Sequence, residues 1–136
     1  MSSFVQISEA ASIGLHAMVL VAKGGGELVS VKTISQATDA SENHLAKVMQ
    51  RLSKAGLVHS VRGPKGGFVL AKEPASISFL DIYEAIEGKI RNETCAIHRD
   101  TCSFKGCMFG GLIGRTTREF TEYFSKTTLS ELAGKL

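Results

Sequence analysis

The chain has 136 residues, of which 43% are apolar and 21% are charged. This length and composition fit one globular domain, or one small domain with an oligomerisation arm, and argue against a disordered chain or a multidomain enzyme. No apolar run approaches the roughly 20 residues of a membrane span, and the first residues lack the pattern of a secretory signal, so we expect a cytoplasmic protein without a membrane partner.

The formal net charge of +3 is distributed unevenly along the chain. Residues 1–72 carry twice as many basic as acidic side chains, whereas residues 73–136 are slightly acidic. The stretch 43–72 holds six lysines and arginines and no acidic residue. Such a stretch suits the phosphate backbone of a nucleic acid. From charge alone, a solvated basic surface is the alternative interpretation.

The first helix is predicted over residues 8–23, where apolar side chains recur at helical spacing. Ser8 can cap its first turn, and three glycines at 24–26 end it, because glycine is a poor helix former. A second helix is predicted after Ser30, up to about Thr38.

A third helix is predicted over residues 42–55, with Ser41 as its N-cap. One face of this helix is apolar, and the other carries basic and hydrogen-bonding side chains, namely Asn43, His44, Lys47, Gln50, Arg51 and Lys54. Two short helices joined by a tight break, the second with such a face, indicate a helix-turn-helix. Any other helical hairpin could show the same spacing.

Two short strands are predicted next, at 57–61 and 68–71, with a turn of glycine and proline between them. Arg62 stands at the base of this hairpin and Lys65 at its tip. A basic hairpin directly after a candidate recognition helix is typical of the wing of a winged helix. The wing places a charged side chain against phosphates or in a narrow minor groove.

The second half begins with a helix predicted over 78–87, opened by a sequence close to a capping box. A longer helix is predicted over 109–126, and a short last helix follows Thr128. The longer helix carries an aliphatic and aromatic stripe made of Leu112, Ile113, Thr116, Phe120, Tyr123 and Phe124. Self-association into a two-fold dimer is the simplest use for this stripe, and packing onto its own domain is the alternative.

These elements predict a mainly α protein with a small β-hairpin wing. Residues 1–74 would form a winged helix-turn-helix DNA-binding domain. Residues 75–136 would hold a helix, a cysteine loop and a long C-terminal dimerisation helix.

All three cysteines, Cys95, Cys102 and Cys107, lie within thirteen residues. An odd number of cysteines does not favour a disulfide framework in a cytoplasmic chain. Their clustering indicates a thiolate-ligated iron–sulfur cluster or zinc, with a metal-free, redox-active thiol state as the alternative. His98 follows Cys95 at a spacing seen in zinc sites, and it is one candidate for a fourth ligand.

The segments 51–57 (RLSKAGL) and 62–68 (RGPKGGF) resemble the Rrf-type winged-helix regulators, a family of IscR-, NsrR- and CymR-like proteins. The resemblance extends over nearly the whole chain, through the cysteine loop to the last helix. It implies a homodimer that binds an inverted-repeat operator in double-stranded DNA through two winged helices.

In this family, the residue corresponding to Arg62 enters the minor groove, and those corresponding to Asn43, Ala46 and Lys47 occupy base-reading positions. Ala46 can offer only a contact with a thymine methyl group. From the residues themselves, Asn43 could pair with adenine, and Lys47 or Arg51 with guanine or phosphate. The predicted DNA-binding residues are Ser41, Asn43, His44, Lys47, Arg51, Arg62 and Lys65.

The resemblance also bears on the fourth ligand of a cluster. In IscR-like proteins a histidine follows the third cysteine by three positions, where this chain has Gly110. Other members use an acidic residue or a histidine of the first helix, sometimes from the partner subunit. Ser12 occupies the acidic position, and His16 the histidine position. The predicted ligands of a [2Fe–2S] or [4Fe–4S] cluster are Cys95, Cys102 and Cys107, with His16 or His98 as the fourth.

We therefore expect a homodimeric transcriptional regulator that senses redox state, nitric oxide or iron–sulfur status. The alternative is a cluster-free or zinc-containing regulator that responds to a small ligand, thiol oxidation or a partner protein. We expect no enzyme, because no catalytic triad or paired carboxylates stand at a useful spacing. An iron–sulfur carrier or a protein-binding winged helix would keep the cysteines but would not need the acid-free stretch at 43–72.

Overall fold

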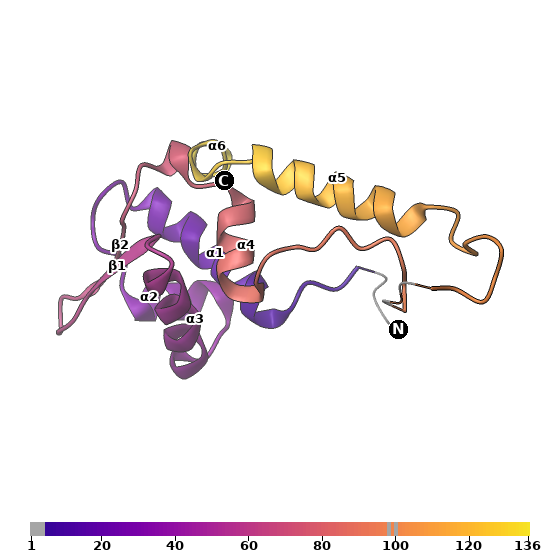
Figure 1. Ribbon diagram of the computed structural model, residues 1–136. Helices are drawn as coiled ribbons and strands as arrows, with labels where there is room; N and C mark the ends of the chain where they lie inside the picture. Colours follow the sequence, from indigo (N-terminus) through magenta and orange to yellow (C-terminus); the bar gives the residue numbers. More distant parts are fainter. Residues whose placement is uncertain (1–4, 98, 100) are drawn as a thin grey trace.

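The computed structural model describes residues 5–97, 99 and 101–136 (Figure 1). Its regular elements are α1 (Glu9–Lys23), α2 (Val31–Thr38), α3 (Glu42–Lys54), β1 (Val58–Val61), β2 (Gly67–Leu70), the short 3-10 helix η1 (Pro74–Ser76), α4 (Phe79–Glu87), α5 (Leu112–Lys126) and α6 (Leu129–Lys135). The mainly helical fold with one small hairpin confirms the predicted fold class. Within the residues just given, no helix is both long and apolar enough to span a bilayer.

Helix α1 is the centre of the hydrophobic core and packs against α3, α4 and α6. Its Ala11, Ala17 and Met18 have no exposed surface. The core also includes Ile82 of α4 and Leu129 of α6. The winged part and the later helices thus share one core, and the domain boundary at residue 74 stays a prediction.

Both helices of the helix-turn-helix begin after a capping serine, of which Ser41 was predicted as a cap. The hydroxyl oxygens of Ser30 and Ser41 accept hydrogen bonds from backbone N–H groups three residues later, and so cap α2 and α3. Between the two helices, Asp39 adopts a left-handed conformation with φ of 53°, which turns the chain sharply from α2 into α3.

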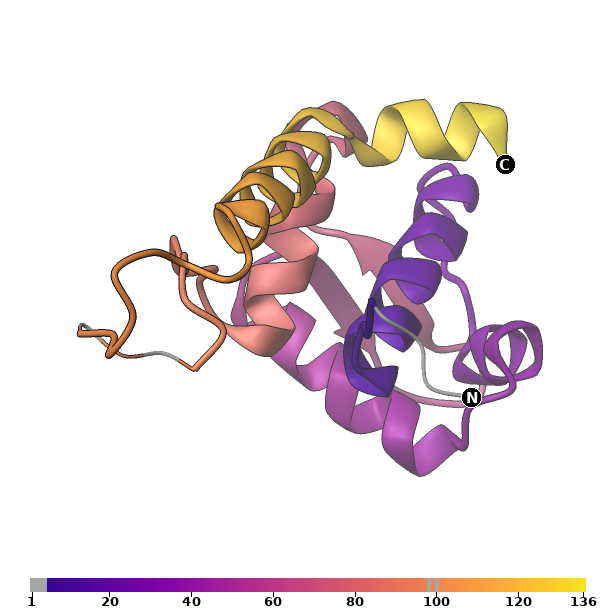
Figure 2. The same cartoon turned by 90° about the vertical axis from the view of Figure 1, so that its right-hand side faces the viewer.

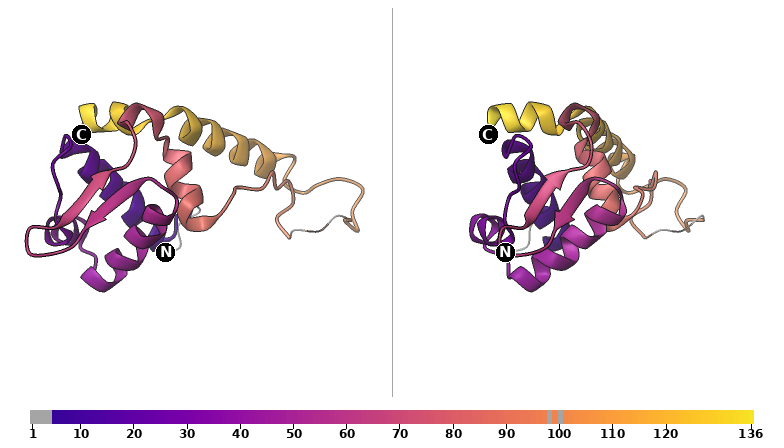
Figure 3. Two further views of the ribbon diagram at one scale, coloured as in Figure 1. Left: turned by 60° about the vertical axis from the view of Figure 1, so that its left-hand side comes forward. Right: turned by 90° about the vertical axis from the view of Figure 1, so that its left-hand side faces the viewer.

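The hairpin β1–β2 is antiparallel and pairs Val58 with Leu70 and Val61 with Gly67. A third segment joins it, because the backbone groups of Val29 and Phe68 exchange two hydrogen bonds of 2.9 and 2.8 Å. The hairpin is therefore tied to the loop between α1 and α2, and its far end projects from the body (Figures 1 and 3).

Helix α4 opens with the capping box that the sequence indicated, in which Ser78 and Asp81 bond to each other's backbone N–H groups. Helix α5 packs against α4 and extends away from the body (Figures 1 and 2). The ring centroids of Tyr83 and Phe120 are 5.4 Å apart, and those of Phe79 and Phe124 are 5.3 Å apart. Part of the stripe predicted for self-association is thus used within the chain.

The predicted start of this helix at Phe109 was wrong, since α5 begins at Leu112. Gly110 and Gly111 have φ values of 57° and 81°, a left-handed conformation that cannot continue into an α-helix. The described residues of the segment 89–111, which ends with these two glycines, contain no helix or strand. This cysteine segment lies at the opposite end of the molecule from the hairpin (Figure 1).

Candidate nucleic-acid interface and cysteine segment

A surface groove of about 690 Å³ separates α3 from the hairpin. Helix α3 contributes Asn43, Ala46, Lys47 and Gln50 to its lining, and the hairpin contributes His59, Ser60 and Arg62. The structure thus brings together three of the predicted DNA-binding residues, Asn43 and Lys47 of α3 and Arg62 of the hairpin. All three side chains are exposed.

The wing turn places its basic residues by way of close backbone contacts. The N–H of Gly66 donates to the carbonyl of Gly63 at 2.9 Å, which closes the turn. A Cβ atom at position 66 would lie 2.1 Å from the carbonyl oxygen of Val61, so this turn requires glycine. Arg62 and Lys65 stand exposed on either side of Pro64. The wing therefore carries two cations out to solvent.

The other predicted DNA-binding residues do not line the groove. Ser41 uses its hydroxyl to cap α3, and the half-buried His44 donates its backbone N–H to that hydroxyl at 3.1 Å. Lys65 lies in the wing turn. Arg51 donates from Nη1 to the carbonyl oxygen of Ile86 in α4 at 3.0 Å. These four residues stay predictions as DNA contacts.

The groove also contains residues that were not predicted as site residues. Gln50 was placed on the polar face of α3, but only the structure shows that this position reaches the groove. His59 and Ser60 of β1 were not singled out. Both are exposed polar residues on a strand, and their proximity to α3 depends on how the hairpin packs against that helix.

The three cysteines are spread along the cysteine segment. Cys95 is half-buried, whereas Cys102 and Cys107 are exposed. Among the described residues, no three or more histidine, cysteine, aspartate or glutamate side chains are grouped so that they could hold a metal ion. His98, the candidate fourth ligand within this segment of the sequence, lies outside the described residues. The thiols suit an iron–sulfur cluster or zinc in chemistry, but the part of the segment that the structure describes does not bring them together with further ligands in one site.

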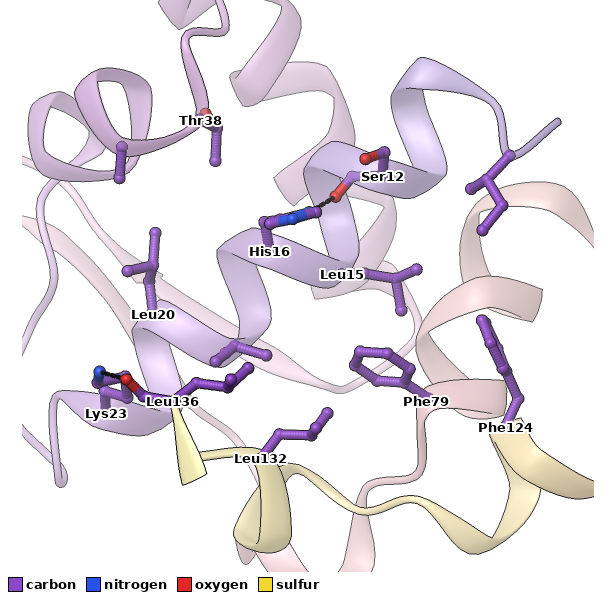
Figure 4. Close-up of a pocket in the computed structure, with 13 residues that line it drawn as sticks. Ser12, Leu15, His16, Leu20, Lys23, Thr38, Phe79, Phe124, Leu132 and Leu136 are labelled. Carbon is purple, nitrogen blue, oxygen red and sulfur yellow. Dashed lines mark hydrogen bonds between the residues drawn. The ribbon is translucent and has the colours of Figure 1, made fainter. Parts of the chain in front are cut away.

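His16, the other candidate ligand, is exposed on α1. Its Nδ1 lies 2.6 Å from the backbone carbonyl oxygen of Ser12 (Figure 4). Because a carbonyl only accepts hydrogen bonds, Nδ1 must carry the proton, and Nε2 of the neutral ring keeps its lone pair. A backbone carbonyl that fixes one ring nitrogen in this way is the usual support of a metal-binding histidine.

The same face of α1 lines a second, mainly apolar groove of about 590 Å³. Leu15, Phe79, Phe124 and Leu132 bring side chains from four helices to this groove (Figure 4). Its polar rim includes His16. The two grooves share no lining residue, and the polar side chains of α3 and the hairpin line only the first one.

Comparisons with known proteins agree with this arrangement. A family model named Rrf2, described as an iron-dependent transcriptional regulator, matches residues 7–135. A protein of Aquifex aeolicus that bears the name of an HTH-type transcriptional regulator is 34% identical over 128 residues, which cover 92% of this chain and 89% of the relative. The structure of CymR, described as the global cysteine regulator of B. subtilis, has a TM-score of 0.80 and 32% identity, and covers 98% of this chain and 99% of its own. The structure of IscR from T. potens has a TM-score of 0.76 and 28% identity, over 97% of this chain and 88% of its own.

Proposed function

Since the chain belongs to the Rrf2 family of DNA-binding transcriptional regulators, we propose that it binds operator DNA as a homodimer and responds to a signal received by its cysteine segment. The matching proteins are regulators and not enzymes, which confirms the expectation from the sequence that this protein is not an enzyme.

The observation that carries the DNA-binding mode is the shared groove of Asn43, Lys47 and Arg62. In the proposed complex, α3 lies in the major groove, where Asn43 and Lys47 face base edges or phosphates. Arg62 then extends from the wing toward the adjacent minor groove, which attracts cationic side chains where it is narrow. The acid-free stretch at 43–72 supplies the sequence-independent attraction.

A second copy of the chain is proposed to cover the exposed apolar surface of α5 and of the groove beside His16. Leu112 and Tyr123 of α5 are 40% and 60% exposed, although the helix packs against α4 through other side chains. The apolar groove beside His16 offers further surface of the same kind. A two-fold dimer would present two copies of α3 to half-sites about one DNA turn apart.

The cysteine segment is the proposed sensor. Cys95, Cys102 and Cys107 would hold an iron–sulfur cluster, with His98 or His16 as the fourth ligand. His16 has its Nε2 prepared for this role, and in a dimer it would serve the cysteines of the partner subunit. When bound, such a cluster supplies redox chemistry that is sensitive to its ligands and surroundings.

A second candidate is a cluster-free sensor that responds to thiol oxidation, a small ligand or a protein partner. Two observations favour it: the described residues form no group of three or more metal-binding side chains, and Cys102 and Cys107 are exposed. An absorption spectrum of anaerobically purified protein separates the candidates when iron, sulfide and zinc are quantified on the same sample. Visible charge-transfer bands with matched iron and sulfide support the cluster. Colourless protein that resists reconstitution supports the second candidate, or zinc if that metal is present.

DNA binding is tested with a duplex enriched from a random-sequence library by the protein itself. The protein should bind this duplex at least about 1,000-fold more tightly than a shuffled duplex of the same length. Its affinity should fall steeply as the salt concentration rises, because each phosphate contact releases counterions. Equal affinity for both duplexes would contradict operator recognition.

A further inference from the structure

The last turn of α4 is the place where three parts of the fold meet. The side chain of Ile86 packs so closely on α1 that a Cβ atom at Gly14 would lie 2.2 Å from its Cδ1. The same added atom would lie 3.3 Å from Cγ1 of Val48 in α3. Side chains of α1, α3 and α4 are therefore in direct contact at this turn. The chain continues from this turn into the cysteine segment (Figure 1).

Arg51 ties this turn to α3. Carbonyl groups in the last turn of a helix lack partners within the helix. The carbonyl of Ile86 accepts a hydrogen bond from Nη1 of Arg51 at 3.0 Å, across 35 positions in the sequence. The interaction combines a charged donor with the negative end of the helix dipole, both of which strengthen it. Arg51 thus holds α3 against the end of α4.

The same turn also holds the beginning of the cysteine segment. Ile90, five positions before Cys95, donates its backbone N–H to Oε2 of Glu84 at 2.9 Å. Glu87, at the end of α4, accepts a hydrogen bond from the hydroxyl of Ser8, the residue that caps α1. One turn of helix therefore contacts α3 through Arg51, the cysteine segment through Glu84, and α1 through Glu87.

We propose that Arg51 is a positioning residue that couples the cysteine segment to the DNA-reading helix, and that it is not a phosphate contact. The inference rests on the proposed function and specifies its regulation. A rearrangement of the cysteine segment that moves Ile90 changes the last turn of α4 and displaces the carbonyl of Ile86. Arg51 carries this displacement to α3, the helix that lines the groove with Asn43 and Lys47.

Coupling of this kind is reciprocal, so it can be measured without knowing the physiological signal. If the state of the cysteine segment changes the setting of α3, then DNA bound to α3 must change the stability of residues 84–94. Amide hydrogen exchange reports that local stability directly. The probe is the library-enriched duplex, at concentrations that saturate each protein variant.

The comparison uses wild type, Arg51→Ala and Lys47→Ala, each in the full-length chain. DNA should slow the exchange of residues 84–94 in wild type by about fivefold or more. Lys47→Ala, which removes one cation from the groove, should retain this protection once saturated. Arg51→Ala should lose it, although α3 itself is still protected by DNA. Arg51→Lys keeps the charge and a hydrogen-bond donor group but loses the planar guanidinium, so it should restore part of the effect. It replaces Arg51→Ala if that variant does not fold.

Salt dependence separates coupling from a phosphate contact. A lost phosphate contact lowers the slope of log affinity against log salt concentration by about 0.9. We expect this reduction for Lys47→Ala if Lys47 contacts a phosphate, and we expect the wild-type slope for Arg51→Ala. A reduced slope for Arg51→Ala would overturn the assignment.

The hydrogen-exchange outcomes are equally decisive. The coupling is refuted if wild type binds the duplex without protection of residues 84–94, or if Arg51→Ala shows the same protection as wild type. A wild-type protein that selects no duplex at all would instead count against the proposed function. The two failures are therefore distinguishable.

Discussion

Gly67 lies against the backbone of Val29 so closely that a Cβ atom at position 67 would stand 2.4 Å from the Val29 carbonyl oxygen. This approach allows the two hydrogen bonds between Val29 and Phe68, which attach the hairpin to the body of the protein. The position of Arg62 in the groove thus depends on a glycine that does not contact DNA in the proposed complex.

Replacement of Gly67 by alanine should therefore destabilise the protein by about 1–3 kcal/mol, because the obstructing atoms belong to the backbone and cannot rotate away. Gly134→Ala is the matched control. A Cβ atom there meets nothing within 4 Å, and alanine favours the helix, so a neutral or slightly stabilising effect is expected. Urea unfolding of both variants measures the difference. Equal stabilities would show that the hairpin is not held by this contact.

Removal of the Arg62 side chain should weaken binding to the selected duplex by about tenfold or more, because Arg62 lines the groove beside α3. Lys72→Ala removes the same charge from an exposed position outside the groove. Lys72→Ala should reduce the affinity less than Arg62→Ala, because it removes only a weaker long-range attraction to the DNA. Fluorescence anisotropy titrations at fixed salt concentration compare the two. Equal losses would indicate a diffuse electrostatic effect without a role for the wing.

If α5 forms the proposed dimer interface, a charged side chain introduced on its exposed apolar surface should weaken the dimer. Leu112→Glu places a carboxylate on the 40% exposed position at its start, and it should shift the protein toward monomer and lower its affinity for DNA. Leu28→Glu is a control of nearly equal exposure, at 41%, in the loop after α1. Light scattering coupled to size-exclusion chromatography measures the mass of each. A monomeric wild type, or a dimer that persists in Leu112→Glu, would contradict the proposed interface.

Ionisation of Tyr83 should lower the free energy of unfolding at alkaline pH. Burial, assisted by the nearby Glu87 carboxylate, raises the pKa of the Tyr83 phenol above its usual 10.0. The folded protein therefore retains this proton more tightly than the unfolded chain, and its stability falls as the pH rises beyond 10. Tyr83→Phe should reduce that fall, whereas Tyr123→Phe, which leaves Tyr83 in place, should not. Thermal unfolding between pH 8 and 11 provides the measurement.

Local signals in the sequence predicted much of the fold. Ser8, Ser30, Ser41 and Ser78 each cap the helix that was expected to follow them, because capping is decided within three or four residues. The wing was predictable for the same reason, from its glycines and proline. The start of α5 was misplaced by three residues, since the apolar pattern continued through two glycines that adopt left-handed conformations.

Contacts between distant segments could not be predicted in this way. Arg51 is predicted as a DNA contact because its position on α3 falls on the polar face, and only the packing of α4 reveals its hydrogen bond to the Ile86 carbonyl. Similarly, the stripe of α5 left self-association and packing onto its own domain both open, and only the structure shows that Phe120 and Phe124 pack against Tyr83 and Phe79 of α4. The groove that unites Asn43 with Arg62 also depends on tertiary structure.

The most direct test of the account is the dissociation constant for the selected duplex under anaerobic reducing and then oxidising conditions. Wild type is compared with the triple variant Cys95→Ala, Cys102→Ala, Cys107→Ala. We predict that the affinity of wild type changes by about fivefold or more between the two states, and that the triple variant binds equally in both. Identical affinities of wild type and triple variant in every state would contradict a regulatory role for the cysteine segment.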